Sequence, residues 1–355
     1  MPSRGDPDHG QRKSDHLDLT ISGDVGFRRT TLLEEVTLVH QALPELALSE
    51  VDISGRLFGR RVASPVVIAS MTGGTERAQR INRSLAEVAE RGGHALGLGS
   101  QRPVLRGGSI DPEALRTYQV RDIAPSVPIL ANLGVMQAAS LPTALIEDLI
   151  GGVQADALCL HMNVAQELIQ PGGDRDFRGA VDTLRRLASE LSVPVIAKET
   201  GCGVSRRTAQ TLAGAGIQHV DLSGAGGTSW VGVETRRASG DAVRQGQEFW
   251  DWGIPTAASL LQVAASRFRT VIATGGIQTG LDVARAVTLG ATACGIARPV
   301  LQALDAGGVP GAQALLASID ADLRAAMLLT GSQDLAALRQ APRLLGTTLR
   351  AWADV

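Results

Sequence analysis

Residues 194–198 read PVIAK, and residues 219–223 read HVDLS. Both runs are mostly apolar, too short for a helix, and lack the polar alternation of a half-exposed strand. Runs of this kind are typical of parallel strands that are buried on both faces. The same pattern recurs at 65–70 (PVVIAS), 95–99 (ALGLG), 128–132 (PILAN), 156–161 (DALCLH), 271–274 (VIAT) and 292–296 (TACGI), which makes eight runs.

Helical segments are expected between these runs, over residues 76–91, 111–122, 179–191, 205–215 and 279–289. Asp111 followed by Pro112 is a good helix start, and Thr279 can cap the helix after it. Eight strand–helix units predict an α/β fold, a closed (β/α)8 barrel over about residues 62–305. A doubly wound open sheet is the weaker alternative, because a nucleotide-binding sheet would show GxGxxG and residues 97–102 (GLGSQR) lack the third glycine.

The remaining chain is expected to belong to the same single domain, residues 1–355. Residues 1–11 are polar and rich in Gly and Pro, which predicts a disordered N-terminal arm. The long loop after the sixth strand contains Trp230, Trp250 and Trp252, and it is expected to cover the C-terminal face of the barrel. Residues 308–355 are rich in Ala and Leu, which predicts C-terminal helices outside the barrel or at an oligomer contact.

Composition excludes several classes of protein. Lys plus Arg is 34 and Asp plus Glu is 36, and aromatic residues make up only 3%, so a nucleic-acid binder is not expected. The 3 cysteines form no CxxC pair, which indicates neither a zinc site nor a disulfide framework and favours a reducing compartment. The uncharged stretch 123–146 is interrupted by Pro125, Pro128 and Pro142, so we do not expect it to span a membrane. The N-terminus lacks the apolar segment of a signal peptide, and the sequence predicts a cytoplasmic protein.

Polar residues collect where the predicted strands end, which is where barrel enzymes place their active sites. They are found at 71–74 (MTGG), 100–102 (SQR), 132–134 (NLG), 161–167 (HMNVAQE), 198–200 (KET), 223–228 (SGAGGT), 275–277 (GGI) and 297–298 (AR). Glycines follow both the seventh and the eighth strand, where backbone N–H groups of barrels often bind phosphate. Either loop alone could be a tight turn, but the two together with Ser223 and Thr228 favour a phosphate site.

Three of these residues have alternative roles. Lys198 could be a rim charge, a Schiff-base amine, a general base or an anion partner, and the predicted phosphate site favours a functional role. Glu167 could be a Mg²⁺ ligand or a charge at a helix N-terminus. His161 could be a structural hydrogen-bonding residue. The basic residues that could hold a second anion are Arg12, Lys13, Arg102 and Arg106.

Longer motifs run in order from residue 12 to about residue 300. They are 12–17 (RKSDHL), 70–74 (SMTGG), 97–102 (GLGSQR), 131–134 (ANLG), 160–177 (LHMNVAQELIQPGGDRDF), 195–205 (VIAKETGCGVS), 221–230 (DLSGAGGTSW), 252–260 (WGIPTAASL) and 273–280 (ATGGIQTG). Together they resemble the motifs of type II isopentenyl diphosphate isomerase, with conservative differences at Met162, Val164 and Ala165 and a less distinctive C-terminal part.

The resemblance implies an FMN-dependent barrel enzyme of isoprenoid biosynthesis that interconverts isopentenyl and dimethylallyl diphosphate, a 1,3-allylic rearrangement without net redox change. It implies Mg²⁺, reduced flavin with NADPH as the reductant, and a homo-oligomer, either a tetramer or an octamer. The implied FMN contacts are Ser70, Met71, Thr72, Ser100, Asn132, Lys198, Ser223, Thr228, Gly275, Gly276, Ile277, Ala297 and Arg298. The implied substrate contacts are Arg12, Lys13, Ser100, Gln101, Arg102, His161, Asn163 and Gln166.

The same resemblance makes Glu167 the Mg²⁺ ligand and His161, Gln166 and Lys198 the catalytic residues. Lys198 near the pyrimidine edge of the flavin would stabilise the anionic reduced form. No second well-placed carboxylate accompanies Glu167, so our hypothesis is that N5 of reduced FMN is the acid and base. Mg²⁺ and the basic residues would then bind and orient the diphosphate.

Three other functions are alternatives to this one, and each requires features that differ from those of this sequence. A 2-hydroxy-acid oxidase needs a His base and an Arg in the late loops, and residues 223–230 and 274–280 contain no His. A dehydrogenase of the IMP type needs a nucleophilic Cys in a late loop, whereas Cys202 follows the fifth strand. A non-catalytic flavin-binding or scaffold protein would keep the glycine loops without needing residues 100–102 and 166–167.

Overall fold

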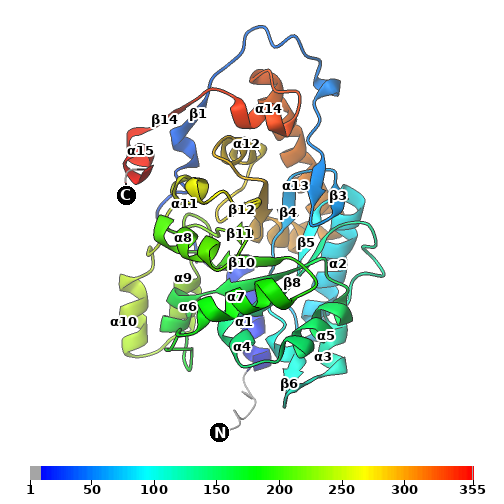
Figure 1. Cartoon of the computed structure of the whole chain (residues 1–355), viewed down its shortest axis with the longest axis vertical. Coiled ribbons are helices and arrows are strands. Elements are labelled where there is room, and N and C mark those ends of the chain that lie inside the picture. The colour runs from blue at the N-terminus through cyan, green and yellow to red at the C-terminus, as the bar shows by residue number, and fades with distance from the viewer. Residues whose placement is uncertain (1–8, 354) are drawn as a thin grey trace.

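The computed structural model describes residues 9–353 and Val355. Eight parallel strands close into a barrel, which confirms the predicted fold class and all eight predicted strands (Figure 1). The strands are β4 (Val66–Ile68), β5 (Ala95–Gly97), β8 (Ile129–Gly134), β9 (Ala157–Met162), β10 (Val195–Glu199), β11 (His219–Asp221), β12 (Thr270–Thr274) and β13 (Ala293–Ile296). β13 pairs with β4 and completes the closure.

Helices surround the barrel on its outside (Figure 1). They are α2 (Glu76–Gly92), α3 (Pro112–Arg116), α4 (Val135–Ala139), α5 (Thr143–Val153), α6 (Val164–Ile169), α7 (Ala180–Glu190), α8 (Arg206–Gly214), α9 (Trp230–Arg237), α10 (Asp241–Glu248), α11 (Thr256–Val263), α12 (Gly280–Thr288) and α13 (Arg298–Leu329). The long loop after the sixth strand therefore carries α9, α10 and α11.

The predicted helix over residues 111–122 is wrong in its second half, because α3 ends at Arg116. The Thr117 side chain donates a hydrogen bond back to the Ala114 carbonyl at 2.7 Å. Tyr118 then turns inward, and its buried hydroxyl donates to the Ser100 carbonyl at 2.6 Å. The hydrogen bond of Thr117 and the burial of Tyr118 thus end the helix at Arg116, although the helical sequence pattern continues beyond that residue.

Segments at the two ends of the chain add elements that the sequence pattern did not indicate. Residues 9–11 belong to the first turn of α1 (His9–Ser22), and residues 1–8 of the predicted arm lie outside the described residues. β1 (Val36–Leu38) pairs with β14 (Arg343–Leu345), β2 (Gly55–Leu57) with β3 (Arg60–Val62), and β6 (Leu105–Arg106) with β7 (Ser109–Ile110). The short 3-10 helices are η1 (Leu33–Glu35), η2 (Leu48–Glu50), η3 (Arg102–Val104) and η4 (Ala264–Ser266).

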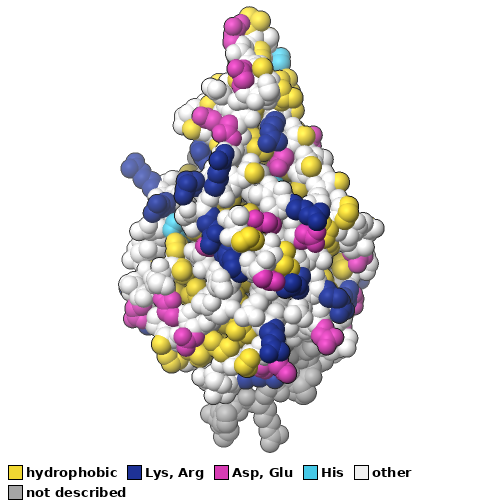
Figure 2. All heavy atoms as spheres, turned by 90° about the vertical axis from the view of Figure 1, so that its right-hand side faces the viewer, with side chains coloured by type: hydrophobic (Ala, Val, Ile, Leu, Met, Phe, Trp, Pro, Cys, Tyr) yellow, Lys and Arg dark blue, Asp and Glu magenta, His cyan; other side chains and the backbone are white. Residues whose placement is uncertain are grey.

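The C-terminal region is helical apart from β14. α13 begins at Arg298 and is broken at Gly308, whose φ is 60°, so the predicted start of the C-terminal helices at residue 308 is a break inside a longer helix. α14 (Leu335–Gln340) and α15 (Thr347–Ala353) follow. The molecule narrows toward one end, where the loop between β1 and η2 projects beside α14 (Figures 1 and 2). No helix within residues 9–353 has the length and apolar character to cross a bilayer.

The barrel interior is closed at the N-terminal end of its strands. Side chains from the strands form a separate apolar cluster inside the barrel, and Leu57 and Val62 of the β2–β3 hairpin belong to it. Asp156, just before β9, pairs with Arg60 at 2.5 Å and with Arg121 at 2.6 Å, which ties the hairpin to the barrel. Only the other end of the barrel, where the strands finish, is left for a ligand.

Thr279 caps α12 as predicted, and the cap yields a stability prediction. Its hydroxyl accepts from the Asp282 N–H at 3.1 Å, and the Asp282 carboxylate accepts from the Thr279 N–H at 3.0 Å. Thr279→Ala is expected to lower the free energy of unfolding by about 1 kcal/mol, measured by urea denaturation. Thr211→Ala, on the exposed face of α8, is the control and should leave the free energy of unfolding unchanged. Equal losses in the two variants would contradict the capping role.

Candidate active site

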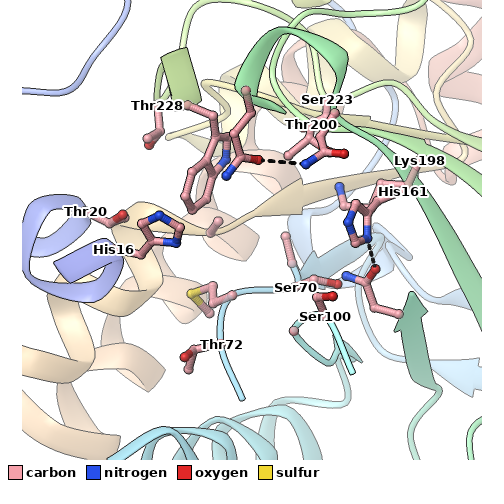
Figure 3. Close-up of a pocket in the computed structure, with 18 of the residues that line it drawn as sticks. His16, Thr20, Ser70, Thr72, Ser100, His161, Lys198, Thr200, Ser223 and Thr228 are labelled. Carbon is pink, nitrogen blue, oxygen red and sulfur yellow. Dashed lines mark hydrogen bonds between the residues drawn. The ribbon is translucent and has the colours of Figure 1, made fainter. Parts of the chain in front are cut away.

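A cavity of about 1320 Å³, its open mouth included, lies at the C-terminal ends of the barrel strands (Figure 3). Its floor is formed by side chains at the strand ends, among them Ser70, His161, Lys198 and Ser223. α1 lies on the opposite side and directs His16 toward the floor. A cavity at the strand ends of a barrel, beneath a covering helix, is where enzymes of this fold bind their ligands.

Most of the residues predicted from the sequence meet in this cavity. Those that line it are Arg12, Lys13, Ser70, Met71, Thr72, Ser100, Arg102, Asn132, His161, Asn163, Gln166, Glu167, Lys198, Ser223, Thr228, Ala297 and Arg298. The predicted residues outside its lining are Gln101, Arg106, Gly275, Gly276 and Ile277. Arg106 is exposed and pairs with Asp111 at 3.1 Å. Gln101 is fully buried and accepts from the Asn132 N–H at 3.0 Å, so it supports a wall residue from behind.

The two glycines after β12 serve close backbone packing. Gly275 and Gly276 have φ values of 104° and 73°, a region that favours glycine. A Cβ on Gly275 would lie 2.1 Å from the Gly224 carbonyl oxygen, and one on Gly276 would lie 2.7 Å from the Gly226 carbonyl oxygen. The loops after β11 and β12 therefore stack backbone on backbone, just behind the cavity wall.

Four buried polar atoms around the cavity have no hydrogen-bond partner among the described residues. They are Thr72 Oγ1, Gln101 Nε2, Thr274 Oγ1 and Arg298 Nε. Buried polar groups almost always have partners, so these atoms fit a site that binds a polar group. Arg298 also donates through Nη2 to the Gly23 carbonyl at 2.7 Å, which ties the wall to the segment that follows α1.

His161 is a neutral residue of the floor. Burial, together with the positive charges of Lys13, Lys198 and Arg102, lowers the pKa of its imidazole to about 3. Its Nδ1 lies 2.8 Å from the Asn132 amide oxygen, which can only accept, so Nδ1 carries the proton and Nε2 remains an acceptor (Figure 3). His161 can therefore orient a ligand but is not a cation at neutral pH.

Cations gather at the mouth of the cavity. Arg12 and Lys13 come from α1 and Arg102 from the loop after β5, and all three line the cavity. Burial and the charges of Arg12 and Arg102 lower the pKa of Lys13 to about 8. An anion bound beside these three residues would offset the repulsion that Arg12 and Arg102 exert on Lys13.

A buried carboxylate that the sequence reasoning missed links α1 to the floor. Glu234 on α9 is fully buried, and its Oε1 accepts from His16 Nε2 at 2.8 Å and from Gln166 Nε2 at 3.1 Å. Burial opposes ionisation, but the bonds from His16 and Gln166 outweigh it and keep the pKa of Glu234 below its usual range. Oε2 pairs with Arg237 at 2.9 Å. Gln166 is thus held in one orientation.

Other cavity residues were also missed, including His16, Thr20 and Trp230. A pattern in the sequence indicates the cavity residues that lie on α1. Arg12, Lys13, His16, Leu17 and Thr20 recur at helical spacing, and all five line the cavity. Trp230 packs edge-on to His16 with ring centroids 5.4 Å apart.

Glu167 offers a single carboxylate to the cavity. Its Oε1 accepts from Asn163 Nδ2 at 2.9 Å and its Oε2 from the Asp174 N–H at 2.8 Å. The side chain is 6% exposed and lines the cavity. Residues 9–353 contain no group of three His, Cys, Asp or Glu that could hold a metal. One carboxylate fits Mg²⁺ when water and a phosphate group supply the remaining ligands.

Comparisons with known proteins place the chain in a family. The model of the FMN-dependent dehydrogenase family matches residues 137–344. An isopentenyl-diphosphate delta-isomerase of Synechococcus is 46% identical over 93% of this chain and 94% of its own length. One of Methanothermobacter thermautotrophicus is 43% identical over 97% of this chain and 95% of its own. A mandelate oxidase structure shares the fold, with a TM-score of 0.62 and 19% identity over 95% of this chain and 98% of that one. The fold, the ordered motifs and these identities agree, and the chain belongs to the isopentenyl-diphosphate delta-isomerases, within the FMN-dependent dehydrogenase family.

Proposed function

We propose that this protein interconverts isopentenyl and dimethylallyl diphosphate for isoprenoid biosynthesis, with FMN and Mg²⁺ bound and NADPH as the reductant of the flavin. The observation that carries the proposal is one cavity whose lining combines the buried Lys198, the three cations Arg12, Lys13 and Arg102, and the carboxylate of Glu167. The matched family is FMN-dependent and the similar proteins are isopentenyl-diphosphate delta-isomerases, which supports both the cofactor and the reaction.

FMN would be held by the polar residues of the floor and wall. The hydroxyls of Ser70, Ser100 and Ser223 stand at strand ends in the cavity lining (Figure 3). The unpartnered Thr72 Oγ1 and Arg298 Nε supply further polar contacts from the wall. Bound FMN in its reduced form would supply the acid and base chemistry that moves a proton between two carbons.

The diphosphate would be held at the mouth. Arg12, Lys13 and Arg102 provide the positive charge, and Glu167 would hold Mg²⁺ against the phosphate oxygens. His161 presents a neutral acceptor to the same space. Gln166 is held between Glu234 at 3.1 Å and Asn163 at 3.2 Å, which orients its side chain in the cavity. These residues bind and orient the substrate rather than carry its proton.

The oxidase alternative is not supported by the placement of the histidines. A 2-hydroxy-acid oxidase would need a histidine base in the late loops. The histidines that line the cavity are His16, on α1, and His161, at the end of β9. The shared fold with mandelate oxidase, at 19% identity, therefore does not bring its chemistry to this chain.

An anaerobic assay in D₂O tests the proposal. Purified protein with FMN, NADPH, Mg²⁺ and isopentenyl diphosphate should yield deuterated dimethylallyl diphosphate only when the flavin is reduced. Absence of product from folded, FMN-loaded protein would refute the isomerase function, and a screen of 2-hydroxy acids would follow. Turnover at the normal rate with a 5-deaza analogue of FMN would refute N5 as acid and base.

Three finer predictions accompany the proposal: NADPH as reductant, a cytoplasmic location and a homo-oligomeric assembly as tetramer or octamer. The reductant and the assembly follow from the family resemblance, and the location follows from the sequence of the N-terminus. Sedimentation of the purified holoenzyme tests the assembly, and comparison of NADPH with NADH in anaerobic flavin reduction tests the reductant. A monomer in sedimentation would contradict the assembly.

The lowered pKa of Lys13 predicts a pH-dependent affinity for anions. Protonated Lys13 is the form that attracts an anion, so the contribution of Lys13 to the affinity for inorganic diphosphate is fully present below its pKa of about 8. Above it the affinity should fall by up to about tenfold per pH unit, one proton being taken up on binding. Calorimetry from about pH 6 to pH 10 measures this. Lys13→Arg, which stays charged, serves as the control, and identical profiles for the two proteins would rule out Lys13 as the titrating group.

A further inference from the structure

Asp221 lies one layer beneath the cavity floor. It is the last residue of β11, and in the parallel register of β10 and β11 its Cα partner is Lys198. Paired positions on adjacent parallel strands direct their side chains to the same face. Lys198 lines the cavity, whereas Asp221 is 5% exposed and lies outside the lining.

Each oxygen of the Asp221 carboxylate contacts a different residue of the floor. Oδ2 accepts from Lys198 Nζ at 2.7 Å, and Oδ1 accepts from the Ser223 N–H at 3.3 Å. Ser223 has a φ of 37°, a left-handed conformation that is uncommon for residues other than glycine. One carboxylate thus fixes both the ammonium at the end of β10 and the peptide that follows β11.

The ion pair of Lys198 and Asp221 is buried, with side-chain exposures of 9% and 7%. In the described part of the chain, Lys198 is the only cation that pairs with Asp221. The neighbouring thiol of Cys159 is neutral, because burial raises its pKa to about 12. The floor therefore presents a positive end to the cavity and keeps a compensating negative charge behind it. The sum of the two charges determines the field that a ligand meets.

We propose that Asp221 is a positioning residue that acts through Lys198: it holds Nζ at the floor and offsets its charge, and so sets how strongly the cavity prefers reduced, anionic FMN over oxidised FMN. The inference rests on the proposed binding of FMN in this cavity. Asp221 is not among the site residues predicted from the sequence. Its carboxylate contacts Lys198 and Ser223, and both of these residues line the cavity.

Asp221→Asn separates the two roles. The asparagine oxygen can still accept from Lys198 Nζ, so the ammonium stays in place while its compensating charge is removed. The amide nitrogen cannot accept, so the 3.3 Å bond from the Ser223 N–H is lost in the same variant. The ratio of the affinities for reduced and oxidised FMN should rise by about tenfold, which raises the midpoint potential of bound FMN by about 30 mV for a two-electron couple. Dye equilibration of the FMN-loaded protein measures the potential from the flavin spectrum. FMN titration of the FMN-free protein measures the affinity.

A double-mutant cycle shows whether the effect passes through Lys198. With Lys198→Met already in place, Asp221 is a buried carboxylate without a cation and takes up a proton. Adding D221N should then leave the potential unchanged. Asp156→Asn is the matched control, since Asp156 is also ion-paired but lies at the other end of the barrel. It should not change the potential.

The outcomes distinguish this inference from the proposed function. An unshifted or lowered potential in D221N, or an equal shift with and without Lys198, overturns the inference alone. Failure of the wild-type protein to bind FMN overturns the proposed function and the inference with it.

If D221N alone does not fold, K198M/D221N is compared with K198M, since replacing both members of a buried pair is often tolerated. Equal potentials are expected there, and a difference overturns the role of Lys198.

Discussion

Lys198→Met is expected to lower kcat for the isomerisation by about 10²–10³-fold, the loss typical of removing one preorganised electrostatic contact. Lys198 is buried at the floor with a side-chain exposure of 9%, so water does not replace the charge when the ammonium is lost. Methionine retains the length and apolar stem of lysine and removes only the charge. Steady-state turnover of isopentenyl diphosphate by protein with chemically reduced FMN measures the effect without requiring NADPH to act.

Loss of stability is the main confounding effect, and the chain offers a control for it. Removing one partner of a buried ion pair costs about 3–5 kcal/mol, because the other charge is left uncompensated. K198M should therefore unfold more readily than the wild type. K198M/D221N removes both charges and should regain most of the stability without regaining activity. Wild-type turnover by the double variant would show that the Lys198 charge has no part in the reaction.

The barrel could be predicted because its strands are buried on both faces, so each appears in the sequence as a continuous apolar run. The pairing of β1 with β14 could not be predicted. It joins Val36 to Leu345, and neither run is long or patterned enough to indicate a strand. Its formation depends on tertiary contacts between distant segments, which local propensity does not report. The early end of α3 has a similar origin, because the burial of Tyr118 overrides the helical pattern.

The candidate site was predictable where it depends on the strand ends. The carboxyl ends of barrel strands converge whatever the helices do, which is why Asn132 and Lys198 were found. The rule does not say whether a side chain faces the cavity or lies behind it, and Gln101 lies behind it. The rule about strand ends also does not predict which residues the covering helices contribute. For that reason His16 and Glu234 were missed.

Glu167→Gln is expected to raise the Mg²⁺ concentration for half-maximal activity by about 10–100-fold, since changes even in the surroundings of a metal ligand cost that much. The activity at limiting Mg²⁺ should fall with it. Glutamine is isosteric and can still accept from the Asp174 N–H, so the loop stays in place. No proposed FMN contact is among the side chains that bond to Glu167, so FMN affinity should not change. Glu147→Gln on the outer helix α5, where Glu147 accepts from the Ser192 N–H at 2.6 Å, is the matched control. If Glu167→Gln kept the wild-type Mg²⁺ dependence, the metal would have to be held by substrate and water alone, and Glu167 would be left as the residue that orders the loop around Asp174.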